Sequence, residues 1–99
     1  MKLFLDATGN VFNPGYGYAV NTLDEPSPFV TGTTLESAIN LAAQVYPRHT
    51  GVFRIDNTEE GYNVQPAEYV EPIAVATLMA LVRNLTTFWD FASVKDVTR

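Results

Sequence analysis

Two stretches of the chain have the pattern of apolar and polar residues that is typical of strands, one as a short apolar run and the other as an alternation. Lys2–Asp6 is followed by a turn-forming cluster and a second apolar pair, so it predicts the start of a β-hairpin. Gly51–Asp56 is a β-rich hexamer, and Tyr62 and Val64 alternate again after a turn. We therefore expect a second hairpin in this part of the chain, followed by an extended or irregular segment that reaches Pro72.

A glycine-rich tyrosine segment lies between these two hairpins. Tyr16, Tyr18 and Val20 fall at every second position, which predicts that they share one face of an extended segment. Gly17 is expected to mark a bulge or a point of close backbone approach. Residues 24–29 contain two prolines and no periodicity, so they predict a loop.

Apolar residues recur at helical spacing in two segments. Thr33 and Glu36 form the pattern of a capping box, and the helical periodicity that follows runs to Tyr46, directly before Pro47. The first helix is therefore expected to end near Pro47. A second helix is expected over Pro72–Ser93, and its apolar residues cover nearly its whole circumference. This is more than one sheet face buries, so part of the second helix needs another covering.

The order of these elements, β-β-α-β-β-α, predicts the fold class. Helices that follow hairpins are typical of an α+β domain with two layers, in which two helices cover one face of a mainly antiparallel sheet. A chain of 99 residues has the size of one small domain, and no long linker divides it. We expect a single domain over residues 1–99.

Charge and composition narrow the classes of partner. Eleven acidic and six basic residues give a net charge of −5, and the basic residues are scattered, so we expect no direct contact with nucleic acid. The chain has no cysteine, which excludes disulfides and thiolate metal sites. Its longest apolar run, Ile73–Val82, is too short to span a bilayer, and its first residues lack the apolar stretch of a secretory signal. We therefore expect a cytoplasmic protein that has no membrane partner.

Catalytic chemistry has little support in the sequence. The single histidine, His49, would need a positioned carboxylate, such as Asp56 or Glu36, and a nearby nucleophile. None of these lies in a recognisable motif with it, and no second imidazole is present to share a metal ion. The glycines around Tyr16 lack the further glycines and the following helix of a phosphate-binding loop. We therefore expect a protein that is not an enzyme and that holds no cofactor and no metal.

Acidic residues gather in one part of the chain. From Ile55 to Val82 the sequence has five acidic residues and no basic residue, which suggests a surface of one charge sign that steers the protein to a basic patch on a larger protein. The plainer interpretation is a solvated acidic loop. Aromatic side chains supply the contacts of many protein interfaces, and Trp89 is the anchor that we expect on the second helix. The predicted interface residues are Tyr16, Tyr18, Asp56, Glu59, Glu60, Tyr62, Glu68, Tyr69, Glu71 and Trp89.

These observations lead to two hypotheses about function. The first is a non-enzymatic, acidic protein-binding module that inhibits or modulates a larger protein by occupying its surface. A short, acidic, cysteine-free chain without a catalytic motif has the general character of bacteriophage accessory proteins, and the larger protein would then belong to the host cytoplasm. The alternative is a structural component, of the kind found in virions, that forms homo-oligomers through its apolar C-terminal helix.

Overall fold

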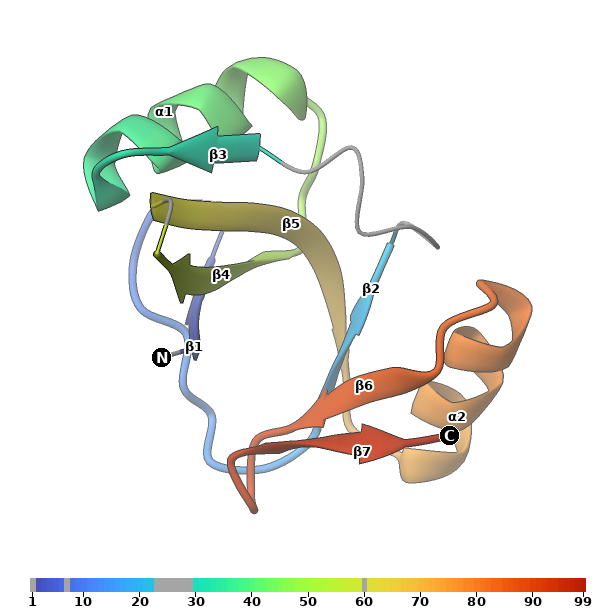
Figure 1. Cartoon of the computed structure of the whole chain (residues 1–99). Coiled ribbons are helices and arrows are strands. Elements are labelled where there is room, and N and C mark those ends of the chain that lie inside the picture. Colours follow the sequence, from blue (N-terminus) through green and yellow to red (C-terminus); the bar gives the residue numbers. More distant parts are fainter. Residues whose placement is uncertain (1, 7, 23–29, 60) are drawn as a thin grey trace.

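The computed structural model describes residues 2–6, 8–22, 30–59 and 61–99. The α+β class is confirmed, but the predicted order β-β-α-β-β-α is wrong, because an additional strand precedes the first helix and a hairpin follows the second. The predicted loop at 24–29 lies outside the described residues. The elements, shown in Figure 1, are β1 (Lys2–Leu5), β2 (Tyr18–Asn21), β3 (Val30–Gly32), α1 (Leu35–Val45), β4 (Val52–Thr58), β5 (Gly61–Val70), α2 (Ile73–Val82), β6 (Thr87–Asp90) and β7 (Lys95–Thr98).

The described strands belong to one sheet, and every pairing between them is antiparallel. The strand order is β1-β4-β5-β2-β6-β7, and β3 pairs with β5 outside this path. The first half of β5 pairs with β3 and its second half with β2, while β4 lies along its other edge. Figure 1 shows β5 bending strongly along its length. The sheet therefore curls into two halves, one packed against α1 and the other against α2.

Both helices lie on the same face of this sheet. Side chains alternate between the two faces along a strand. Val64 and Val70, at even-numbered positions of β5, pack in the clusters under α1 and α2 respectively. Ala67 and Tyr69, at odd-numbered positions, pack in a third cluster on the opposite face.

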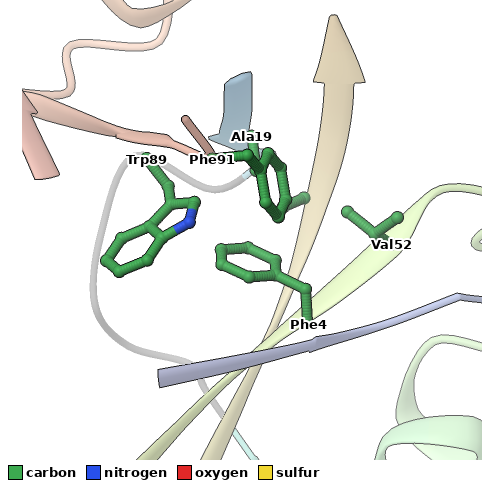
Figure 2. Packing of buried hydrophobic residues seen from close by; sticks show 6 residues of the cluster. Phe4, Ala19, Val52, Trp89 and Phe91 are labelled. Carbon is green, nitrogen blue, oxygen red and sulfur yellow. The ribbon is translucent and has the colours of Figure 1, made fainter. Parts of the chain in front are cut away.

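That opposite face curls around a second core, which the prediction of two layers did not include. The ring of Phe4 lies 4.9 Å from that of Phe91 and 5.7 Å from that of Trp89, measured between centroids, and Figure 2 shows the three rings gathered together. Phe4 lies on β1 and Trp89 on β6, so this inner core joins the two halves of the sheet. Arg54 on β4 adds a polar link, since its guanidinium makes two 2.9 Å hydrogen bonds to Asp96 on β7.

The second helix is about half as long as predicted. The predicted range is 72–93, but α2 ends at Val82, and the chain returns as the hairpin β6–β7. Asn84 adopts a left-handed conformation (φ 58°), which ends the helix in the way that a glycine often does at this position. Phe88 packs under α2 and Trp89 lies in the inner core. A strand that is buried on both faces has a continuous apolar run, and such a run also fits a helix.

The first helix, α1, has nearly the predicted extent, but another pair of residues caps it. The Thr34 hydroxyl accepts a hydrogen bond from the Ser37 amide at 3.1 Å, and the Ser37 hydroxyl accepts one from the Thr34 amide at 3.1 Å. The capping box is therefore formed by Thr34 and Ser37 rather than by Thr33 and Glu36. The helix ends at Val45, just before the proline that is expected to stop it.

Candidate functional site

The two tyrosines of the glycine-rich segment lie on different faces, contrary to the prediction. Tyr18 packs edge-on against Phe88 beneath α2, with ring centroids 5.5 Å apart. Tyr16 lies before β2 and contacts Tyr69, a residue of the inner face, with centroids 6.4 Å apart. Gly17 lies between the two tyrosines and has a φ of 81°. This left-handed residue breaks the alternation on which the prediction depends.

Tyr16, Tyr69 and Glu71 form a hydrogen-bonded group near the end of β5. The Tyr69 hydroxyl donates to the Tyr16 carbonyl oxygen at 2.9 Å, and the Tyr16 hydroxyl donates to the Glu71 carboxylate at 3.3 Å. A Cβ on Gly17 would come within 2.7 Å of the Tyr69 ring, which confirms the predicted close backbone approach. The group therefore holds the bend that leads into β2, and Tyr16 is its most exposed aromatic member.

Two other predicted interface aromatics are covered by the fold. Trp89 lies on β6 rather than on a helix and is only 6% exposed. The guanidinium carbon of Arg54 lies 5.6 Å from the centroid of the Trp89 ring. Tyr62 is half-buried and packs at the edge of the cluster under α1. Trp89 is therefore not available as the exposed anchor that the sequence predicts.

Two of the predicted acidic residues form ion pairs within the molecule. Asp56 accepts a 3.3 Å hydrogen bond from Nε of Arg54, the buried arginine of the inner core. Burial disfavours the charged form of Arg54, but hydrogen bonds and charge from its carboxylate partners outweigh this and raise its pKa. Glu68 pairs with Arg83, which also donates to the Asn21 carbonyl oxygen at 3.1 Å. These two acids therefore stabilise the fold where they lie.

The other acidic residues lie far from one another. Glu59 is in the turn before β5, and Glu71 directly follows that strand. The ten residues of β5 separate them, so they lie at opposite ends of this long, bent strand. Glu60 lies outside the described residues. The described acids therefore do not gather into one acidic patch.

The arrangement of small and large residues in α2 is reversed relative to an ordinary surface helix. Its buried residues are Ala76 and Ala80, which pack on Val20 and Phe88, and Met79 is half-buried beside them. Its large aliphatic side chains are between 41% and 77% exposed, and all of them except Ile73 lie on the side of the helix opposite the buried alanines. The exposed large residues of α2 are Ile73, Val75, Leu78, Leu81 and Val82.

The outward side of α2 carries no charge. The only polar residue of the helix is Thr77, whose hydroxyl donates to the Ile73 carbonyl oxygen at 2.8 Å. With 3.6 residues per turn, Leu78 lies at the centre of the outward side, opposite the buried alanines. The sequence signal for this surface is a ten-residue apolar run with no charged residue. We name the following five residues the α2 outer face: Ala74, Val75, Leu78, Leu81 and Val82.

His49 lies beside an open hollow of about 780 Å³ that Arg48 and Asp6 also line. Nε2 of His49 donates to the Val52 carbonyl oxygen at 2.9 Å, so a backbone group orients the ring. A hydrogen bond from the Thr8 hydroxyl is the main cause that lowers the pKa of Asp6. The side chains of His49 and Asp6 therefore both stabilise local backbone turns.

Within the described part of the chain, no three histidine, aspartate or glutamate residues come together as a metal-binding group. Among its helices, none has the length and the apolar character needed to cross a membrane.

Comparisons of the chain with models of protein families, with curated proteins and with solved structures give no significant match. The geometry of the α2 outer face is therefore the basis of the functional proposal.

Proposed function

We propose that this chain is a non-enzymatic protein-binding module and that the α2 outer face is its contact surface. The observation that carries the proposal is the reversed packing of α2, with alanines toward the sheet and leucines and valines toward solvent. Full burial of one large aliphatic side chain contributes about 1.5–3 kcal/mol. The leucines and valines of this face are between 41% and 77% exposed, so a partner that covers the face gains a part of this contribution from each of them.

The groups around the α2 outer face suit an interface with an apolar centre and a polar rim. Glu71 lies just before the first turn of α2, and Arg83 caps its last turn. Both residues are anchored, Glu71 by the Tyr16 hydroxyl and Arg83 by the Asn21 carbonyl oxygen. The rim is therefore fixed before a partner arrives, which lowers the entropy cost of binding.

The proposal concerns the surface and the class of activity. Steering by one acidic patch plays no part in it, because the described acids are paired or far apart. That the contact inhibits or modulates a larger host protein stays a prediction, and so does the cytoplasmic location.

A photo-reactive amino acid at position 78 tests the proposed contact surface. Position 41 is the matched control, because Leu41 is also an exposed leucine on a helix, at 41% against 60% for Leu78. On irradiation in the cells that make the protein, we expect discrete protein adducts from position 78 and none from position 41. Equal adducts from both positions, or none from position 78, would contradict the proposal. Circular dichroism checks that both labelled chains are folded.

A further inference from the structure

The α2 outer face is symmetric about its centre. Leu78 has Ala74 and Val75 on its N-terminal side and Leu81 and Val82 on its C-terminal side, at spacings of three and four residues. Val75 and Val82 are seven residues apart and therefore lie on one flank of Leu78. Ala74 and Leu81 lie on the other flank by the same spacing. A face with this symmetry and no charge is complementary to a second copy of itself.

We infer that the α2 outer face binds the same face of a second copy of this chain, with the two α2 helices antiparallel about a two-fold axis at Leu78. This inference rests on the proposed function and names its partner. In this arrangement Leu78 contacts Leu78 of the partner subunit, and Val75 contacts the partner's Val82. Ala74 contacts the partner's Leu81, so a small side chain meets a large one on that flank.

Charges at the two ends of α2 favour the antiparallel arrangement. Glu71 precedes the helix, whereas two arginines lie at its other end. Arg83 is already paired with Glu68 of the same chain, so the net positive charge at this end comes from Arg99, whose Nη1 lies 3.5 Å from the Leu81 carbonyl oxygen. Antiparallel helices bring Glu71 of one copy to the end of the other copy that carries Arg99, and they also oppose the two helix dipoles. Parallel helices would bring like charges together.

The exposed area fits a reversible dimer. The exposed fractions of the four large side chains of the α2 outer face correspond to roughly 400 Å² per copy, which lies within the range of the largest patch on an ordinary monomer. Two copies would bury up to about 800 Å² in total, which is in the range of weak and reversible contacts. Figure 1 shows α2 at the margin of the molecule.

Sedimentation equilibrium of the full chain, from about 1 μM to 1 mM, tests the dimer. We expect a monomer–dimer equilibrium for the unmodified chain, and Leu78→Glu to weaken it by at least about a hundredfold, because two carboxylates would meet in an apolar contact. Leu41→Glu is the matched control and should leave the equilibrium unchanged. Val82→Glu provides a second test on the same face should Leu78→Glu not fold. A chain that stays monomeric at 1 mM, or equal effects of the variants on α1 and α2, would overturn the inference.

Cysteine pairs test the antiparallel arrangement, since the chain has no cysteine of its own. We expect mild oxidation to join the Leu78→Cys variant to itself and to join the Val75→Cys variant to the Val82→Cys variant when the two are mixed. Preferential joining of Val75→Cys to Ala74→Cys would indicate parallel helices and would overturn the arrangement. A monomer in solution combined with position-78 adducts to a different protein would overturn the dimer and leave the proposed function standing. A monomer without such adducts would overturn both.

Discussion

The two helices contact the sheet in the same way. Ala38 and Ala42 are the buried residues of α1, and Ala76 and Ala80 are the buried residues of α2. Each pair is four residues apart, so both members lie on one side of their helix. Small side chains at these positions let each helix lie close to the curled sheet.

The helices differ on the sides that do not touch the sheet. In α1, Leu35 and Ile39 are half-buried beside the alanine contact, and the outward side carries Glu36, Asn40 and Gln44. In α2, the outward side is the uncharged α2 outer face. The contact with the sheet therefore needs little more than a pair of alanines, and the outward residues distinguish a covering helix from a binding helix.

The largest effect on stability is expected at the link between the two halves of the sheet. Asp96→Ala removes the bidentate partner of Arg54 and should lower the free energy of unfolding by about 3 kcal/mol, because a buried charge loses its main partner. Urea denaturation measures this loss. The double variant Arg54→Met with Asp96→Ala should recover only part of it, because Asp56 then loses its ion pair with Arg54. A loss under about 1 kcal/mol in the single variant would mean that the Arg54–Asp96 ion pair contributes little to holding the two halves of the sheet together.

The next effect distinguishes the two sides of α2. Ala80→Leu should destabilise the protein by about 2 kcal/mol, because the added atoms have no space between helix and sheet. Ala74→Leu, on the α2 outer face, should change stability by less than about 0.5 kcal/mol. Ala42→Leu in α1 should resemble Ala80→Leu if the helices share one mode of contact. Thermal and urea unfolding measure all three, and similar effects at positions 74 and 80 would contradict the reversed packing.

A smaller effect is expected at the helix caps. Thr34→Ala should cost about 1 kcal/mol, because the Ser37 amide loses its side-chain acceptor. Thr33→Ala is the control and should cost much less, since Thr33 is the residue that the sequence pattern, but not the structure, places in the cap. By contrast, Pro72 is the N-cap residue of α2 and provides no side-chain hydrogen bond to its first turn. Equal losses at positions 33 and 34, measured by urea unfolding, would contradict this assignment.

The smallest expected effect is on the pH dependence of stability. It involves one turn in each half of the sheet. The Ser93 hydroxyl donates to Asp90 in the β6–β7 turn and lowers the pKa of that carboxyl below its ordinary value of 3.8. The Thr8 hydroxyl does the same for Asp6 after β1. A lowered pKa in the folded state means that this stabilisation is present above the ordinary pKa and is lost as the pH falls through the folded value.

Chemical unfolding between pH 6 and pH 2, on the order of two units either side of the ordinary carboxyl pKa, measures this loss. Asp90→Asn and Asp6→Asn should each flatten the decline in stability at acid pH by a similar small amount. A decline as steep as in the unmodified chain would show that these turns contribute nothing to acid sensitivity.

Local patterns explain which parts of the fold could be predicted. The periodicity before Pro47 predicts α1, and the alternation in Gly51–Asp56 predicts the β4–β5 hairpin, because neighbouring residues determine both. The C-terminal hairpin was missed because Phe88 and Trp89 are both buried, so no alternation marks the strand. Asn84 is the signal that could have located the end of α2, as a residue that adopts left-handed backbone readily.

The candidate site was likewise predictable from the sequence only in part. An apolar run that exceeds what one sheet face buries can be recognised at Ile73–Val82 without a structure, and it indicates that some surface is left to be covered. The pattern does not say which residues remain outside. Trp89 illustrates this, because it was predicted as an exposed anchor and is covered by the inner core.

By itself, the sequence determined an α+β protein with a capped first helix, a central hairpin and more apolar surface than one sheet face covers. Only the tertiary structure decided that the alanines of α2 face inward, that its leucines and valines face solvent, and that the acidic residues separate into ion pairs and distant positions. The physical reason is that local periodicity depends on neighbouring residues, whereas the side of a uniformly apolar helix that is buried depends on how closely a curled sheet approaches it.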